Sequence, residues 1–154
     1  MARIHPTAII ESNVQLGEGT SVWDNVHIRR DAVLGDECIV GGKSMIAYEV
    51  QIGHRVKINS NVYICNGVTI EDGVMISAGT IFTNDRFPRA TIPDFCLAIG
   101  TPARVVGVVC KCGEPVHRFG EHDSTTAVQV TCQCGLSYSI NGHAVVEAEA
   151  AIAV

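Results

Sequence analysis

The chain has 154 residues, of which 47% are hydrophobic but only 5% aromatic, and its formal net charge is −5 at pH 7. This charge disfavours nucleic acid or an anionic membrane as a partner of the whole chain, and the composition predicts one ordinary domain with an aliphatic core and a small appendage. No secretory leader and no run of roughly 18 apolar residues is found, so we expect a soluble cytoplasmic protein.

From residue 4 onward a large aliphatic residue recurs at every sixth position, thirteen times without a break, and Phe82 follows. A small or β-branched residue comes four positions after each, and Gly, Asn or Asp fills eight of the thirteen places three positions after. A helix needs a period of 3.6 and hairpins alternate by two, so neither fits. Short strands joined by sharp turns predict a parallel β-helix, a mainly β fold. The aliphatic positions are Ile4, Ile10, Leu16, Val22, Ile28, Leu34, Val40, Ile46, Ile52, Ile58, Ile64, Ile70 and Ile76.

This repeat resembles the left-handed β-helix of the hexapeptide-repeat transferases, in which three hexads form one triangular coil. Thirteen hexads then make a little over four coils, with strands stacked about 4.8 Å apart. The Ile10 side, which holds every third hexad from Ile10, presents an outward series that we call the apolar column: Ile9, His27, Met45, Tyr63 and Ile81. Such a series is typical of a partner surface, so we expect it to pack against another copy of the chain. The resemblance implies a homotrimer with active sites between neighbouring chains.

Two residues of the column leave alternatives open: His27 and Tyr63 either pack in the interface or line a ligand groove. In the nearby "IRRDA" we expect Arg29 to pair with Asp31. The opening "HPTA…SVWDNVHIRRDA" is also similar to γ-class carbonic anhydrases, which hold zinc with three His. The His residues of the repeat fall on different sides or at turns, which argues against that zinc site.

The six-residue period of aliphatic residues is lost in "GTIFTNDRFPRA", residues 79–90. Residues 56–90 resemble the hexapeptide-repeat N-acetyltransferases of nucleotide-linked amino sugars, which include 3-N-acetyltransferases of a UDP-amino-uronic acid or a dTDP-amino-deoxy sugar. The resemblance covers residues 1–107 and implies acetyl-CoA as co-substrate. It places Asn84 at the reaction centre. Asp85 is a candidate charge partner, and His27 on the apolar column is a further catalytic candidate. The candidate substrate contacts are Tyr63, Thr83, Arg86 and Arg89, and the candidate coenzyme contacts are the small residues Ser77, Ala78 and Gly79.

The same segment also reads as a surface loop of turn residues. Soon after it, "AIGTPARVVG" looks like the family's closing segment, so about two coils are missing relative to that family. Two other functions therefore stay open. One is a non-catalytic trimeric β-helix that binds a sugar nucleotide or a partner protein; the other is an acyltransferase for another small amine or hydroxyl.

Residues 108–140 contain two C-x-C-G motifs, with Cys110 and Cys112 in the first and Cys132 and Cys134 in the second. Four thiolates suit a closed tetrahedral zinc site, so we predict a structural, zinc-ribbon-like module; unliganded thiols on a hairpin are the alternative. Cys38 falls on an inward position as a small apolar filler. Residues 141–154 form an Ala-rich tail, expected to be a short helix or loose.

Overall fold

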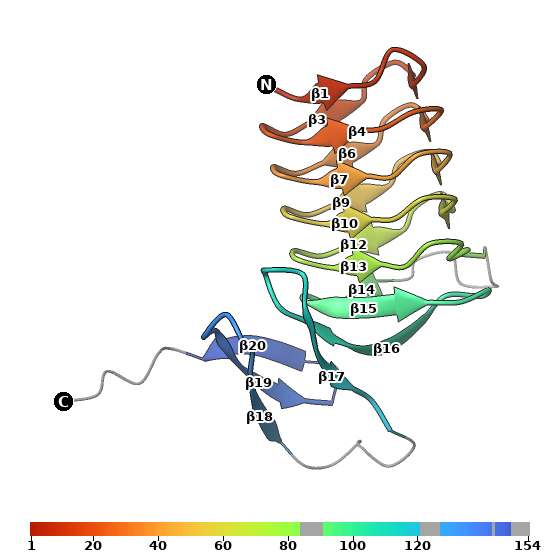
Figure 1. Cartoon of the computed structure of the whole chain (residues 1–154). Helices are drawn as coiled ribbons and strands as arrows, with labels where there is room; N and C mark the ends of the chain where they lie inside the picture. Colours follow the sequence, from red (N-terminus) through yellow and green to blue (C-terminus); the bar gives the residue numbers. More distant parts are fainter. Residues whose placement is uncertain (84–90, 121–126, 143, 149–154) are drawn as a thin grey trace.

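The computed structural model describes residues 1–83, 91–120, 127–142 and 144–148. Its N-terminal part is a stack of coils, and the C-terminal strands lie at the far end of this stack (Figure 1). Each of the first thirteen strands has two residues, and each of the first ten pairs in parallel with the strand eighteen residues further on, as Arg3 does with Ser21. The predicted β-helix with three sides is therefore confirmed.

Each side of the β-helix is one parallel sheet. The Ile10 side consists of β2 (Ile9–Ile10), β5 (His27–Ile28), β8 (Met45–Ile46) and β11 (Tyr63–Ile64). The Leu16 side consists of β3 (Gln15–Leu16), β6 (Val33–Leu34), β9 (Gln51–Ile52), β12 (Thr69–Ile70) and β14 (Thr91–Ile92). The Ile4 side begins with β1 (Arg3–Ile4), β4 (Ser21–Val22), β7 (Ile39–Val40), β10 (Lys57–Ile58) and β13 (Met75–Ile76).

The repeated aliphatic residues fill the interior of the coils. From Val22 to Ile76 each of them is at most 4% exposed, whereas Ile4 at the open N-terminal end is 48% exposed. The small or β-branched residues four positions later are buried as well from Thr20 onward. Two inward positions in every six thus make one continuous apolar core, which holds the coils together.

Left-handed backbone turns bend the chain at the corners. Positive φ is found three positions after the aliphatic residue in twelve of the thirteen hexads. Gly and Asn tolerate this conformation, but here Glu37, Lys43, Glu49 and Arg55 adopt it too. Between coils, backbone N–H groups donate to carbonyls of the next coil, for example Trp23 to Val40 at 3.0 Å.

The sequence suggested that the repeat ends at Phe82, but in the structure it continues. Phe82 is buried in the core, and ten residues later Ile92 takes the next inward position on the Leu16 side. Ala98 then lies opposite Ile76 on the Ile4 side. The step from 82 to 92 exceeds six by four residues, so the segment between them is an insertion into a fifth coil, and the expectation of little more than four coils was too low.

After β15 (Cys96–Ile99), which still pairs in parallel with β13, the strands turn antiparallel. β15, β16 (Arg104–Val109) and β17 (Pro115–Arg118) extend the Ile4 side. A separate antiparallel sheet follows, formed by β18 (Val128–Thr131), β19 (Ser137–Asn141) and β20 (Ala144–Ala148). The expectation of a short helix or loose chain was thus wrong for β20, while the predicted domain boundaries at residues 107 and 140 remain predictions. The described part of the chain has no helix able to cross a bilayer.

Candidate functional site

The apolar column runs down the outside of the Ile10 side as predicted. His27 pairs with Ile9 above it and Met45 below it, and Tyr63 follows Met45. Ile81 continues the series through an isolated parallel bridge to Tyr63. Ile9 is 58% exposed, Tyr63 37% and Ile81 36%, so large apolar groups face outward over the whole height of the β-helix.

His27 is held at the upper part of this column by a carboxylate. Its Nε2 lies 2.8 Å from Oε1 of Glu11, and Nε of Arg29 lies 2.6 Å from the same oxygen. The other oxygen of Glu11 accepts a hydrogen bond from the backbone N–H of Arg30 at 3.0 Å. Because the carboxylate of Glu11 accepts a hydrogen bond at Nε2, it favours the tautomer of His27 with its proton there.

The partner expected for Arg29 was wrong. Arg29 pairs with Glu11, while its guanidinium lies 4.2 Å from the centre of the Tyr48 ring. Asp31 instead accepts a hydrogen bond from the side-chain amide of Asn13 at 3.1 Å and lies 3.8 Å from Nε of Arg30. Arg29 therefore belongs to the same charged group as His27.

The lower end of the column brings together two predicted site residues, Tyr63 and Thr83. Thr83 is exposed and follows the buried Phe82, whose backbone N–H donates to Tyr63. His27 does not join them, because Met45 separates it from Tyr63. Two strand spacings, about 10 Å, therefore lie between the His27 and Tyr63 backbones.

The predicted coenzyme contacts lie at the corner that leads into this lower end. Ala78 is exposed, Ser77 is half-buried, and a Cβ added to Gly79 would meet nothing within 4 Å. The corner is closed from below by residues 100–103, since Ile81 donates to the carbonyl of Gly100 at 3.1 Å. An open backbone of this kind can approach an extended ligand closely. The remaining predicted residues, Asn84, Asp85, Arg86 and Arg89, lie outside the described residues.

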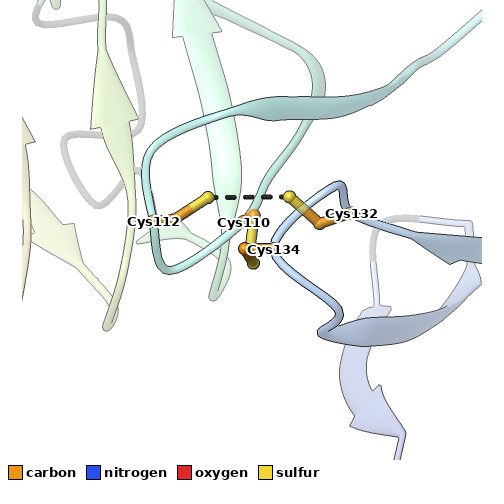
Figure 2. Close-up of side chains that lie close together, drawn as sticks. All are labelled: Cys110, Cys112, Cys132 and Cys134. Carbon is orange, nitrogen blue, oxygen red and sulfur yellow. Dashed lines mark hydrogen bonds between the residues drawn. The ribbon is translucent and has the colours of Figure 1, made fainter.

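A second candidate site lies at the junction between β-helix and C-terminal strands. The sulfur atoms of Cys110, Cys112, Cys132 and Cys134 all lie within 4.8 Å of one another, and we call them the four-cysteine cluster (Figure 2). The Sγ–Sγ distance is 3.4 Å for Cys110 and Cys134 and 3.6 Å for Cys112 and Cys132. A tetrahedral zinc site with Zn–S bonds of about 2.3 Å has sulfur atoms about 3.8 Å apart, so the donor set fits this metal.

Each C-x-C-G motif forms a tight turn under its sulfur atoms. The backbone N–H of Gly113 donates to the carbonyl of Cys110 at 2.7 Å, and that of Gly135 donates to Cys132 at 2.9 Å. Both glycines have φ near +95°, a conformation that strongly favours glycine. The two motifs are therefore built alike, one on each side of the cluster.

Hydrogen bonds prepare one thiol of the cluster to ionise. Burial acts to raise the pKa of Cys110, but the Tyr138 hydroxyl and the backbone N–H of Cys112 lower it to about 7. Burial and the hydrogen bond to Cys110 raise the pKa of Tyr138, so its hydroxyl stays protonated and donates to the sulfur at 3.2 Å. Cys110 is thus stabilised as thiolate, the form that binds metal. Backbone N–H groups act to lower the pKa values of Cys132 and Cys134, but burial and hydrogen bonds with the other thiols outweigh this and raise them.

The other cysteines do not have the character of nucleophiles. Burial raises the pKa of Cys38 and of Cys65, and it raises that of Cys96 to about 11. Cys38 also donates to the carbonyl of Gly53 at 3.1 Å, which agrees with its predicted role as a filler of the core. Their thiols are neutral at physiological pH.

Sequence reasoning missed Glu11 and Tyr138. Glu11 stands directly before "SNV" in an ordinary hexad, and only the coil geometry brings it to His27, sixteen residues on. Tyr138 follows the second C-x-C-G motif by three residues, a spacing that could have marked it as a neighbour of the cysteines.

A family model for the bacterial transferase hexapeptide (six repeats) matches residues 13–48 and 49–84. Among curated proteins, the chain is 39% identical over 61 residues to the dTDP-3-amino-3,6-dideoxy-α-D-galactopyranose 3-N-acetyltransferase of Aneurinibacillus thermoaerophilus, covering 40% of this chain and 25% of that protein. It is 46% identical over 35 residues to the acyl-[acyl-carrier-protein]–UDP-N-acetylglucosamine O-acyltransferase of Brucella ovis, covering 23% and 13%. The chain therefore spans at most a quarter of these relatives.

Solved structures agree with this likeness. A variant of the perosamine N-acetyltransferase from Caulobacter crescentus, in complex with CoA and GDP-perosamine, is 30% identical with a TM-score of 0.55, covering 69% of this chain and 56% of that chain. A hexapeptide-repeat-containing acetyltransferase from Vibrio cholerae has a TM-score of 0.60 at 21% identity, covering 70% of both chains, which shows the fold alone. Residues 13–84 of this chain thus match the bacterial transferase hexapeptide, and the chain is similar to N-acetyltransferases of nucleotide-linked amino sugars.

Proposed function

We propose that this chain is an N-acetyltransferase that moves the acetyl group of acetyl-CoA to an amine on a nucleotide-linked sugar. The observation that carries the proposal is the 30% identity, over 69% of this chain, to a perosamine N-acetyltransferase solved with CoA and GDP-perosamine. The likeness to a dTDP-amino-sugar 3-N-acetyltransferase supports the same acceptor class.

The reaction needs orientation and proton handling more than an activated protein nucleophile. The neutral amine nitrogen attacks the acetyl carbonyl carbon, the carbon–sulfur bond breaks, CoA leaves as the thiol, and the amine gives up one proton. In this proposal Asn84 orients the amine or thioester and Asp85 balances charge. His27, the further catalytic candidate, lies two strand spacings from Tyr63, so the proposal gives it no part in this step and assigns it to packing in the interface.

The binding residues follow from the lower end of the apolar column. Tyr63 and Thr83 would contact the sugar, and Arg86 and Arg89 would hold a phosphate or a sugar carboxylate. The open corner of residues 77–79 would receive the coenzyme arm, an arrangement supported by the free space at Gly79.

The chain would act as a homotrimer, with the apolar column covered by a neighbouring copy. The support is the exposure of Ile9, Tyr63 and Ile81 on one side. Residues 100–103 close the same side from below, which fits a site at the seam between chains. The coils would wind in the left-handed sense of the family, and the cytoplasm remains the predicted location.

The four-cysteine cluster would hold a structural Zn²⁺ in a zinc-ribbon-like module. Supporting this are the mutual sulfur distances, the paired glycine turns and the hydrogen bonds that stabilise thiolate on Cys110. Four protein thiolates leave no open position for a reacting water, so the metal would contribute stability and no step of acetyl transfer.

The test is release of CoA thiol from acetyl-CoA with a panel of dTDP-, UDP- and GDP-linked amino sugars. We expect turnover with at least one amine acceptor and none with the matched sugar that carries a hydroxyl in place of the amine. Asn84→Ala should abolish turnover while sedimentation shows the assembly unchanged.

Two outcomes would overturn the proposal. Saturable binding of nucleotide sugars without CoA release would make the chain a binding protein. Turnover on the hydroxyl sugar alone would make it an O-acyltransferase, the class of the Brucella relative.

A further inference from the structure

Tyr138 occupies a position between the four-cysteine cluster and the β-helix. It is the largest fully buried side chain in the described part of the chain. Its hydroxyl accepts a hydrogen bond from the backbone N–H of Lys111 at 3.0 Å and donates one to Sγ of Cys110 at 3.2 Å. Because the amide occupies the oxygen from one side, the hydroxyl proton is directed at the sulfur.

The ring of Tyr138 packs on Phe95, at a centroid distance of 5.4 Å and an angle of 56°. This contact joins two parts of the molecule, because Phe95 lies on the turn of the fifth coil whereas Tyr138 lies in β19. Both belong to a second apolar cluster, distinct from the interior of the coils, that also includes Val108, Cys110, Cys132, Ile140 and Val145. Phe95 is therefore the residue through which the fifth coil enters this cluster.

Phe95 is in turn fixed to the coil above. Its backbone N–H donates to the carbonyl of Asp72 at 3.0 Å, and its own carbonyl accepts from Val109 at 2.8 Å. Its ring lies over Gly73, where an added Cβ would come within 2.8 Å of the ring. An unbroken series of contacts thus leads from Cys110 through Tyr138 and Phe95 to the fourth coil.

A second contact supports the same junction. Nζ of Lys57, on β10 of the Ile4 side, donates to the carbonyl of Cys112 at 3.3 Å. Together with Cys110, Cys112 thus lies on the turn that rests against the β-helix, while Cys132 and Cys134 come from the separate sheet. A metal bound to all four would join the two sheets across this junction.

We propose that Tyr138 couples the metal centre to the β-helix, as an outer hydrogen-bond donor to the Cys110 sulfur and as the ring that transmits metal binding to Phe95. The inference rests on the metal site of the proposed function and is independent of acetyl transfer. In the loaded protein, Tyr138 orients a ligand, and the fifth coil is stabilised through Phe95. Outer partners of this kind typically change metal affinity by about 10–100-fold.

Co²⁺ titration of the full chain tests whether the Tyr138 hydroxyl supports metal binding at Cys110. Thiolate-to-Co²⁺ charge-transfer absorption reports binding, and competition with Zn²⁺ gives the relative affinity for zinc. We expect Tyr138→Phe, which keeps the ring and removes the hydroxyl, to weaken binding by about 10–100-fold and to shift the charge-transfer band. Tyr48→Phe is the matched control, because Tyr48 lies under Arg29, on a corner of the coils outside the cluster.

Hydrogen exchange tests whether Phe95 transmits metal binding to the β-helix. The amide of Phe95 donates to the carbonyl of Asp72, and the amide of Val109 donates to the carbonyl of Phe95. In the wild type we expect metal binding to slow hydrogen exchange at both amides. Phe95→Leu should leave the Co²⁺ spectrum unchanged while abolishing this protection at Val109. The proposal is overturned if no metal binds, if Tyr138→Phe binds as tightly as the wild type, or if Phe95→Leu keeps the full protection. None of these outcomes alters the CoA-release test, so the two proposals fail separately.

Discussion

Thr20 and Thr80 occupy the same place in their hexads and are both fully buried, yet their hydroxyl groups differ in bonding. Oγ1 of Thr20 donates to the carbonyl of Gly35 at 2.8 Å and accepts the N–H of Cys38 at 3.0 Å. Oγ1 of Thr80 has no hydrogen-bond partner among the described residues. The same residue type therefore bridges two coils at one corner and fills space at another.

This difference predicts opposite effects of one substitution. Thr20→Val should destabilise the chain by about 1–3 kcal/mol, because the buried N–H of Cys38 and the half-buried carbonyl of Gly35 lose their partner. Thr80→Val should leave stability unchanged or raise it, since the lost hydroxyl is buried without a bond. Urea denaturation followed by circular dichroism measures both, and equal losses in the two variants would contradict the assignment.

Gly73 and Gly79 both lie at turns of the coils, but they differ in the space that is available for an added side chain. Their φ angles are +66° and +71°, so alanine at either position costs about 1–2 kcal/mol of backbone strain. Only at Gly73 does the new Cβ also overlap a neighbour, the Phe95 ring at 2.8 Å. We expect Gly73→Ala to lose clearly more unfolding free energy than Gly79→Ala, and a smaller or equal loss would show that the Phe95 ring moves freely.

The carboxylate of Glu11 gives the first coils a pH dependence. Partial burial acts to raise its pKa, but the Arg30 N–H, the His27 hydrogen bond and the Arg29 charge together hold it below the ordinary 4.5. A depressed pKa in the folded state means stability that is present above 4.5 and is lost as the pH falls through the folded value.

Melting temperatures of wild type and Glu11→Gln, measured from neutral to acidic pH, test this dependence. The wild type should be the more stable at neutral pH, and the difference should shrink in acid. A difference that stays constant across the series would show that the charge on Glu11 has no part in it.

The apolar column predicts that a charge at its top weakens assembly without unfolding the coil. Ile9 is 58% exposed in the single chain, so Ile9→Asp costs little there, but an aspartate buried against a neighbouring copy lacks a partner. Sedimentation velocity should show a shift from trimer toward monomer for Ile9→Asp. Gln15→Asp, on the exposed Leu16 side of the same coil, is the control and should sediment as the wild type does.

The period of six was sufficient to predict the coils, their sides and the inward residues, because each hexad repeats one local geometry. The turn residues were only partly predictable. Asn and Gly favour positive φ by themselves, but Lys43 and Arg55 adopt it because the coils on either side fix the corner. The last hexads, at Ile92 and Ala98, escaped notice because four extra residues displace them from the count.

Contacts between distant segments were beyond sequence reasoning. The spacing of the cysteines predicted their grouping, but nothing in the local pattern indicates that Tyr138 meets Phe95 or that Lys57 reaches Cys112. The pairing of Arg29 was wrong for a related reason. Asp31 is its neighbour in sequence, whereas the coil places Glu11 beside it.

The insertion between Phe82 and Ile92 leaves and rejoins the coil at two rungs that are already defined by their neighbours, through Ile81 on Tyr63 and Thr91 on Thr69. The length of the insertion therefore does not affect the register of the coils: a shorter or longer segment would rejoin the same strand positions and leave every other hexad in register. In such an architecture, this segment can be replaced as a unit while the coils of the scaffold stay constant.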